Sequence, residues 1–228
     1  MKFAANLSMM FTEYDFIQRF QAAADNGFKA VEYLFPYEHD AGVLAGHLAK
    51  NSLQQVLFNM PPGNWDSGER GIASLPGREN EFQENVDIAI SYAKALQCPR
   101  LHCMAGLRDD TIAYEVQQAT YISNLRKAGE RCKSEGIQLL IEPINSTDMP
   151  GYFLSSFDYA LEILREVSGN FPDLIKLQFD IYHCQMIHGD VPAWLERCHH
   201  QTAHLQIAGV PGRHEPDIGT LPLNDIIA

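Results

Sequence analysis

The sequence lacks the short motifs that mark phosphate-binding loops and zinc knuckles. Neither GxGxxG nor GxxxxGK[ST] occurs in its 228 residues, and no CxxC pair is present. These absences argue against a dinucleotide-binding fold, a P-loop enzyme and a zinc-knuckle protein. The cysteines are odd in number and scattered, so we expect reduced thiols in or near the core and no disulfide framework. They are Cys98, Cys103, Cys132, Cys184 and Cys198.

Positive charge and long apolar runs are also scarce. Lys and Arg number 17 against 29 Asp and Glu, which gives a net charge of -12. That balance argues against a nucleic-acid partner and against an anchor on anionic lipid. No apolar run approaches the length of a membrane span, and the N-terminal segment is too short and polar for a signal peptide. We therefore expect a cytoplasmic protein, in which an anionic substrate would need a local arginine or a metal.

What the sequence does contain is a regular alternation of apolar, β-branched stretches with segments of helical periodicity. The predicted strands cover residues 3–8, 30–34, 54–58, 100–104, 138–142, 175–180 and 204–208. The predicted helices cover residues 14–26, 41–51, 78–96, 114–134, 155–167 and 191–199. Gly27, Gly136 and Gly169 stand where helix C-caps are expected. Such alternation predicts a parallel sheet covered by helices.

The repeated strand–helix units favour a (β/α)8 TIM barrel over a doubly wound open sheet. The open sheet would carry a glycine-rich turn after its first strand, and no such turn is present there. A full barrel needs eight strands and about 250 residues. Residues 224–228 look like the opening of the seventh helix. We therefore expect residues 1–228 to form one barrel domain that is C-terminally incomplete, without the eighth strand–helix unit.

Polar residues end three neighbouring predicted strands. Glu142 ends the fifth strand, Asp180 the sixth, and Gln206 lies in the seventh. Because the active site of a parallel barrel lies at the carboxyl-terminal ends of its strands, these oxygen donors should converge there. Such a set suits Mg²⁺ or Mn²⁺. Each residue taken alone could instead be a hydrogen-bonded buried group or a helix N-cap.

Other polar residues extend this pattern. His183 follows the sixth strand by what reads as one short loop, and Arg213 lies in a Gly- and Pro-containing loop where it could bind a substrate carboxylate. Glu32 ends the second strand and could also face the barrel mouth, although hydrogen bonds to neighbouring backbone are its expected role. The long loop 59–71 carries Trp65 and Arg70. It could be a lid or specificity element, with Arg70 contacting substrate, or a packed surface loop.

Several segments together resemble the hydroxypyruvate isomerase family of xylose-isomerase-like barrels, which includes 2-oxo-tetronate isomerases. The resemblance spans nearly the whole chain in the expected order. It implies a (β/α)8 barrel, a divalent metal, and a small hydroxy-keto acid as substrate. The segments are FAANLSMMFTE, VEYLFPYE, GERGIASLPGRE, LLIEPIN, QFDIYH and HLQIAGVPGRHEP.

The resemblance also implies roles for individual residues. Glu142 matches a metal ligand and acid/base, Asp180 and Gln206 match metal ligands, and His183 and Arg213 match substrate-contacting positions. A further family glutamate lies on strand eight and has no counterpart in this sequence. The implied reaction interconverts hydroxypyruvate and tartronate semialdehyde by proton transfer through an enediolate. Association into a homo-oligomer is possible, although no interface can be identified.

Three alternatives stay open at this point. GERGIA and IEPIN favour the three-carbon substrate, whereas HLQIAG, RHEP and NLSMMFTE favour a four-carbon 2-oxo-tetronate. A zinc-dependent endonuclease or phosphatase on the same barrel would collect several histidines, which the strand ends do not offer. A non-catalytic barrel without the second carboxylate is the third alternative.

Overall fold

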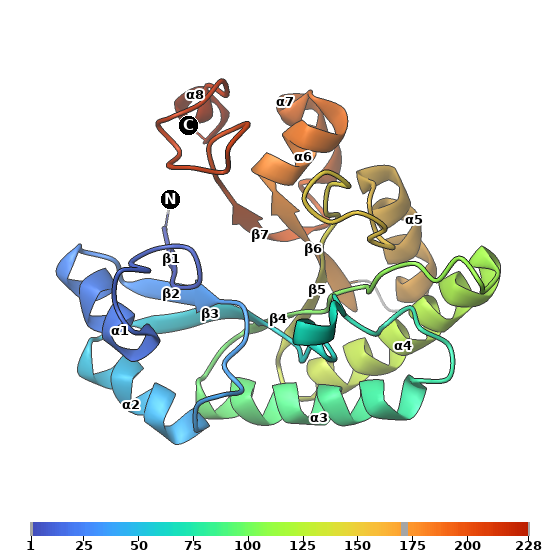
Figure 1. Ribbon diagram of the computed structural model, residues 1–228, viewed down its shortest axis with the longest axis horizontal. Helices are drawn as coiled ribbons and strands as arrows, with labels where there is room; N and C mark the ends of the chain where they lie inside the picture. The colour runs from blue at the N-terminus through green and yellow to red at the C-terminus, as the bar shows by residue number, and fades with distance from the viewer. Residues whose placement is uncertain (1, 170–172, 228) are drawn as a thin grey trace.

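The computed structural model describes residues 2–169 and 173–227. Within these residues, seven parallel strands form one sheet in the order β1-β2-β3-β4-β5-β6-β7, so each strand pairs with its neighbour in sequence. Figure 1 shows this sheet curling into part of a barrel, with the helices along its outer side. A doubly wound sheet would reverse its strand order part-way. The barrel prediction is therefore confirmed.

The elements alternate along the chain as the sequence predicts. The strands are β1 (Ala5–Asn6), β2 (Ala30–Tyr33), β3 (Gln54–Asn59), β4 (Arg100–His102), β5 (Gln138–Ile141), β6 (Ile175–Asp180) and β7 (Thr202–Gln206). The helices are α1 (Phe16–Asp25), α2 (Ala41–Lys50), η1 (Trp65–Ser67), α3 (Glu79–Ala95), α4 (Tyr114–Ser134), α5 (Phe157–Ser168), α6 (Ile181–His188), α7 (Val191–Cys198) and α8 (Leu223–Ile227).

Helix α5 illustrates how the local sequence sets an element. Its apolar residues recur three and four positions apart, which places them on one face, and they are buried against the sheet. Ser156 caps the N-terminus by accepting from the Tyr159 N–H, and Gly169 ends the helix with a positive φ. The buried residues are Phe157, Ala160, Ile163, Leu164 and Val167.

The structure corrects several of the sequence-based boundaries. β1 spans only Ala5–Asn6, and β7 begins two residues earlier than expected, at Thr202. Residues 181–188, expected to begin as a loop, form helix α6, which starts directly after β6. His183 therefore lies in the first turn of a helix, where its backbone is fixed.

The hydrophobic core lies between the curled sheet and its outer helices. All five cysteines are free and buried, which confirms their expected state. Within the described residues, no helix is long and apolar enough to cross a membrane.

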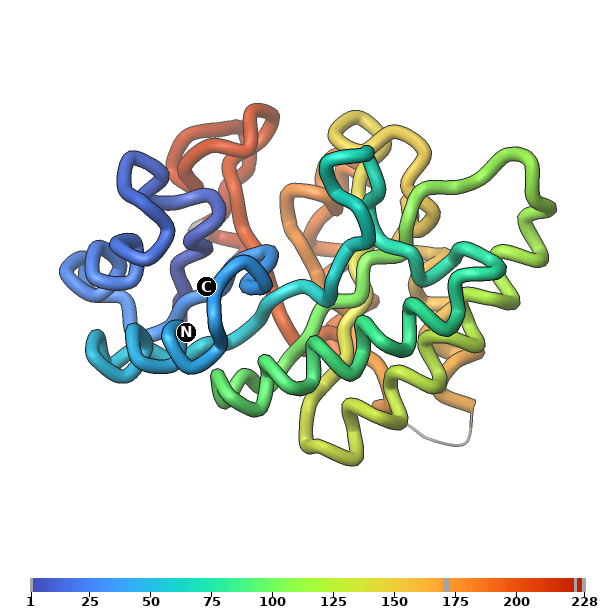
Figure 2. The backbone as a smooth tube through the Cα atoms, turned by 60° about the horizontal axis from the view of Figure 1, so that its bottom comes forward, coloured from blue at the N-terminus to red at the C-terminus, as the bar shows by residue number. Residues whose placement is uncertain are grey.

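The first and last segments of the chain lie on the same side of the molecule, as the blue and red tubes in Figure 2 show. A groove of about 1640 Å³ lies between them, and its lining includes residues of both edge strands of the sheet, β1 and β7. Its walls include Asn6, Glu32, Asp180, Gln206 and Arg213. The groove thus reaches the strand ends where the predicted polar residues are placed.

Candidate active site

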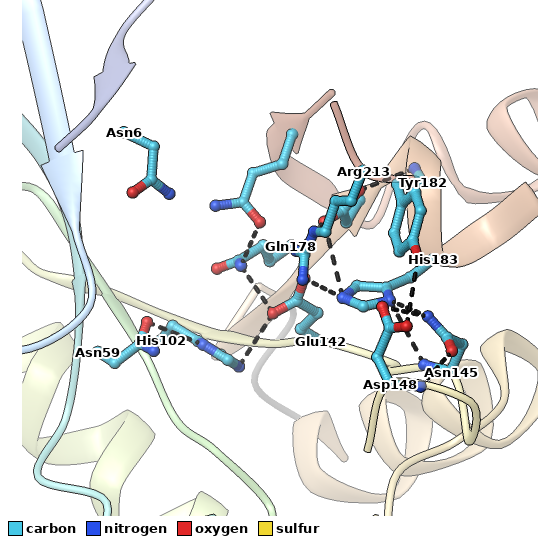
Figure 3. Close-up of polar contacts among 12 residues, drawn as sticks. Asn6, Asn59, His102, Glu142, Asn145, Asp148, Gln178, Tyr182, His183 and Arg213 are labelled. Atoms are coloured by element: carbon cyan, nitrogen blue, oxygen red, sulfur yellow. Dashed lines mark hydrogen bonds and ion pairs between the residues drawn. The ribbon is translucent and has the colours of Figure 1, made fainter. Parts of the chain in front are cut away.

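Three buried side chains converge at the ends of β5 and β6. Figure 3 shows two of them, Glu142 and His183, close together. Glu142 follows β5, Asp180 is the last residue of β6, and His183 lies in the first turn of α6. His183 Nε2 lies 4.0 Å from Glu142 Oε1 and 3.8 Å from Asp180 Oδ2. One potential ligand atom from each residue lies within 4.8 Å of the other two. Parallel strands have brought residues about 40 positions apart to one point.

Asp180 has two roles, one for each carboxylate oxygen. Its Oδ1 accepts the Tyr182 N–H at 2.8 Å and so caps α6. Its Oδ2 instead accepts from Arg213 Nη2 at 3.0 Å. The N-cap interpretation is therefore confirmed, and the same geometry holds the second oxygen toward the cluster. The role of Asp180 as a site residue stays a prediction.

The carboxyl group of Glu142 is buried, with 5% of the residue exposed. Its Oε2 accepts from Gln178 Nε2 at 2.9 Å and lies 3.7 Å from His102 Nε2. Its Oε1 has no hydrogen-bond partner among the described residues. Burial, and then the charge of Asp180, raise the pKa of Glu142 well above its ordinary value. Such a carboxyl group is suited to accept and return a proton near neutral pH.

Two histidines border this carboxyl group. Burial lowers the pKa of His102 to about 3, so its ring is neutral at physiological pH. Burial also lowers the pKa of His183, against an opposing effect of Asp180. The positive charge that offsets the two carboxylates is therefore carried by Arg213 and not by a histidine.

Arg213 reaches the cluster from the loop after β7 (Figure 3). Its guanidinium carbon lies 5.1 Å from the centre of the Tyr182 ring, and its backbone has a φ of 56°, in the left-handed region. Burial lowers the pKa of Arg213, but the carboxylates of Asp180, Glu142 and Asp148 outweigh this effect and raise it. A permanent cation thus lies beside the two buried carboxylates.

Gln206 belongs to a second group of polar residues that adjoins the first. Its Oε1 accepts from Gln178 Nε2 at 2.8 Å, and its Nε2 donates to Glu32 Oε1 at 2.6 Å. Glu32 also accepts from Asn6 Nδ2 at 3.0 Å and lies 2.6 Å from His204 Nε2. The partners of the Glu32 carboxylate are therefore side chains, and the expectation of backbone partners was wrong. Gln178 links the two groups by donating to both Glu142 and Gln206.

Arg70 is not in contact with this cluster. Its guanidinium stacks on Trp65 at 3.9 Å and donates to the carbonyl oxygens of Trp65 and Glu69. The Trp65 ring in turn packs edge-on against Phe35, at 5.0 Å between ring centres. The loop between β3 and α3 is thus an ordered, packed loop in this state, and substrate contact by Arg70 stays a prediction.

Three residues of the candidate site were not predicted from the sequence. His102 ends β4 and Gln178 lies inside β6, so the rule applied to Glu142 and Asp180, a polar residue in an apolar strand, could have found both. Asn145 lies three residues beyond Glu142 in the following loop, and its Nδ2 is 2.8 Å from His183 Nδ1. No pattern in the sequence marks Asn145, because its role depends on a helix 38 residues away.

The donor set is compatible with a divalent cation. Two buried carboxylates lie together, and one of their oxygens, Glu142 Oε1, has no partner among the described residues. Buried anionic oxygens are unfavourable unless they are paired or bind a metal. Oxygen donors of this kind suit Mg²⁺ or Mn²⁺. The structure therefore offers a candidate metal site centred on Glu142 and Asp180.

Comparison with solved structures supports the barrel fold and finds a structure that is also similar in sequence. A crystal structure described as AP endonuclease, family 2 from Brucella melitensis superposes with a TM-score of 0.96 at 45% identity, covering 99% of this chain and 86% of that chain. The apo structure of 3-keto-D-glucoside 4-epimerase from E. coli gives a TM-score of 0.79 at 15% identity, covering 100% of this chain and 86% of that one. The second likeness concerns the fold alone.

Sequence comparison gives the family. Residues 20–228 match the xylose isomerase-like TIM barrel family. The chain is 50% identical to 2-oxo-tetronate isomerase of Cupriavidus necator, over 96% of this chain and 84% of the relative. It is 43% identical to hydroxypyruvate isomerase of Escherichia coli, over 97% of this chain and 84% of that relative. The chain therefore belongs to the xylose isomerase-like TIM barrel family, in the group that contains hydroxypyruvate isomerase and 2-oxo-tetronate isomerase.

Proposed function

We propose that this isomerase interconverts hydroxypyruvate and tartronate semialdehyde, with Glu142 as the residue that transfers the proton. The observation that carries the proposal is the buried Glu142 carboxyl group, whose Oε1 is unpartnered within the described part of the chain and faces Asp180 and His183. A carboxyl group with a raised pKa can take a proton from carbon at neutral pH and return it to the adjacent carbon.

The proposed steps follow from the positions of the side chains. Glu142 removes a proton from C3 of hydroxypyruvate, and the electrons of that C–H bond form the C2=C3 double bond of an enediolate. The hydroxyl proton passes from O3 to O2, the carbon-bound proton returns from Glu142 to C2, and C3 becomes the aldehyde carbon. Arg213 binds the substrate carboxylate, because its guanidinium offers further N–H donors beyond the one that Asp180 accepts. The neutral ring of His183 lies beside the reacting atoms and can contact a substrate oxygen.

Glu142, Asp180 and Gln206 are the proposed ligands of a divalent cation, Mg²⁺ or Mn²⁺. When bound, such a cation supplies stabilisation of the negative charge that develops on the substrate oxygens. Gln206 could serve as a ligand through Oε1, because a carbonyl oxygen has a second lone pair beyond the one that Gln178 uses.

The test is a side-by-side assay of wild type and Glu142→Gln on hydroxypyruvate with Mg²⁺ or Mn²⁺. We expect turnover by the wild type and a loss of about 10²- to 10⁴-fold in kcat for the variant, the range that acid–base groups contribute. A Glu142→Gln variant with near wild-type turnover would refute the role of Glu142. Glu162→Gln, at an exposed position of α5, is the matched control.

A four-carbon 2-oxo-tetronate is the second candidate substrate, favoured by the 50% identity to 2-oxo-tetronate isomerase of Cupriavidus necator. Both acids share the carboxylate and the 2-oxo group, so the proposed roles of Glu142 and Arg213 apply to either. The ratio of kcat/KM for the two acids, measured on one preparation, decides between them.

A zinc-dependent nuclease is the rival class, and the description of the Brucella structure is the observation in its favour. The candidate cluster offers one histidine and two carboxylates, whereas zinc hydrolase sites typically collect several histidines. Stoichiometric zinc and cleavage of an abasic oligonucleotide would support the rival. The absence of nucleic-acid partners, the cytoplasmic location and a homo-oligomeric state stay predictions.

A further inference from the structure

The orientation of the Asn145 side-chain amide is fixed by two backbone groups. Asn145 Oδ1 accepts from the N–H of Thr147 at 3.0 Å and from the N–H of Asp148 at 2.9 Å. Backbone N–H groups can only donate, so an amide nitrogen cannot occupy the position of Oδ1. In agreement, Asn145 Nδ2 donates to the carboxylate Oδ2 of Asp148 at 3.1 Å. The group that Asn145 presents to His183 is therefore its NH₂.

Within the described residues, the hydrogen-bond partners of His183 Nδ1 are two donors, both from Asn145. The NH₂ group of Asn145 lies 2.8 Å from Nδ1, and the backbone N–H of Asn145 points to the same atom at 3.4 Å (Figure 3). A ring nitrogen that receives two hydrogen bonds must present a lone pair. Since a neutral imidazole carries one hydrogen, that hydrogen must lie on Nε2.

This arrangement is the reverse of the one found around metal-binding histidines. A histidine that binds a metal through one nitrogen normally donates the other N–H to a carboxylate, a carbonyl or a water molecule. For Nε2 of His183 to bind a metal, Nδ1 would have to carry the hydrogen, which would then point at the two donors of Asn145. The proximity of His183 to Glu142 and Asp180 is therefore not evidence that it is a ligand.

We infer that Asn145 sets the tautomer of His183, so that His183 donates a hydrogen bond from Nε2 to the substrate and does not bind the metal. Nε2 lies 4.0 Å from Glu142 Oε1 and 3.8 Å from Asp180 Oδ2, too far for direct hydrogen bonds. A substrate oxygen between these groups would be within reach of the Nε2 hydrogen. Asn145 is thus a positioning residue that acts through His183; the donor role toward substrate rests on the proposed function, whereas the tautomer does not.

The tautomer is directly measurable by long-range ¹H–¹⁵N correlation spectra of protein labelled with ¹⁵N-histidine, without metal and with Mg²⁺. Nitrogen shifts distinguish a ring nitrogen that carries hydrogen from one that presents a lone pair, and His183→Gln identifies the His183 signals. We expect the hydrogen on Nε2 in both samples. A His183 ring with its hydrogen on Nδ1 would overturn the inference.

Asn145→Asp tests whether Asn145 is the cause. One carboxylate oxygen can keep the contacts with the N–H groups of Thr147 and Asp148, and the other then faces Nδ1 as an acceptor. We expect a hydrogen to appear on Nδ1 of His183 in this variant. Asn59→Asp is the matched control, because Asn59 Oδ1 lies 3.0 Å from Nδ1 of the other buried histidine, His102. It should alter the His102 signals only; an unchanged His183 in Asn145→Asp would contradict the positioning role.

Metal affinity gives an independent readout that does not use catalysis. Titration of the metal-free protein with Mn²⁺ should show that Glu142→Gln and Asp180→Asn weaken binding by more than ~100-fold, beyond the range of outer groups. His183→Gln should weaken binding by at most ~10-fold. Equal losses in Asp180→Asn and His183→Gln would make His183 a ligand and refute the inference. If the protein binds Mn²⁺ as expected but isomerises neither acid, the proposed function fails. The tautomer of His183 and its exclusion from the metal ligands then still stand.

Discussion

Glu142→Gln should inactivate the enzyme and at the same time stabilise its metal-free form. In the wild type the buried carboxyl group lies next to a second carboxylate, Asp180, and its Oε1 has no partner within the described residues. The glutamine can keep its carbonyl oxygen toward Gln178, whose Nε2 now donates to Glu142 Oε2. Its amide NH₂ then takes the place of the unpartnered oxygen, beside Asp180. The unfavourable pair of hydrogen-bond acceptors formed by Glu142 Oε1 and the Asp180 carboxylate is thus replaced by a donor and an acceptor.

The magnitude follows from the groups involved. A buried acceptor without a partner costs about 1–3 kcal/mol, so a gain of that order is expected in the free energy of unfolding. For a chain of this size each kcal/mol raises Tm by roughly 2–4 °C. Since the group being replaced is titratable, the gain depends on pH.

The sign of the pH dependence follows from the raised pKa of Glu142. Its folded pKa lies above the ordinary 4.5, so the protonated carboxyl group favours the folded wild type at low pH. This contribution is lost as pH rises through the folded pKa. Glutamine does not titrate. The stability advantage of Glu142→Gln should therefore be smallest below about pH 4.5 and largest once the pH exceeds the folded pKa.

Urea unfolding in the presence of a chelator, at about pH 5 and about pH 8, measures this difference. Glu162→Gln makes the same chemical change at an exposed position of α5 and should alter the free energy of unfolding by no more than about 0.5 kcal/mol. A variant that is less stable than the wild type at pH 8, or an advantage that is the same at both pH values, would show that the carboxyl group is not unfavourably buried.

The other predictions concern separate parts of the molecule. Arg213→Met should raise KM for the acid substrate by about 10- to 100-fold, from the loss of a charged hydrogen bond, and an unchanged KM would remove Arg213 from the carboxylate site. Gly71→Ala should lower the free energy of unfolding by ~3 kcal/mol or more, because φ is +104° and the new Cβ would overlap the Met104 carbonyl oxygen. Gly136→Ala, with φ of +72° and open space, should lose only ~1–2 kcal/mol; equal losses in urea unfolding would refute the steric argument. Glu32→Gln should weaken Mn²⁺ binding by ~10- to 100-fold, because Glu32 accepts a hydrogen bond from Gln206 and so orients this proposed ligand. An unchanged affinity in calorimetric titration would show that Glu32 does not act on the metal site through Gln206.

The sequence predicted the elements well where a pattern repeats and less well where a boundary depends on neighbours. α4 spans Tyr114–Ser134 as expected, because its helical periodicity is long. β1 is short and β7 is shifted because pairing with β2 and β6 decides where each strand begins and ends. Helix α6 was missed since Asp180 serves as both strand end and N-cap, which leaves no loop between β6 and α6.

Some residues of the candidate site could likewise be predicted from the sequence, whereas the contacts of others could not. Glu142 and Asp180 could be found from the sequence, because a polar residue that ends an apolar strand of a parallel barrel must face the site. The alternation of strands and helices by itself determined a parallel sheet covered by helices, because periodicity and short connections leave few other arrangements. The absence of a glycine-rich turn after the first strand then favoured the barrel over the doubly wound sheet. The chemistry of His183 depends instead on which atoms of Asn145 face it, and that follows from hydrogen bonds to two backbone groups. Only the tertiary structure brings Asn145 against His183, because 38 positions separate the two residues and no sequence pattern links them.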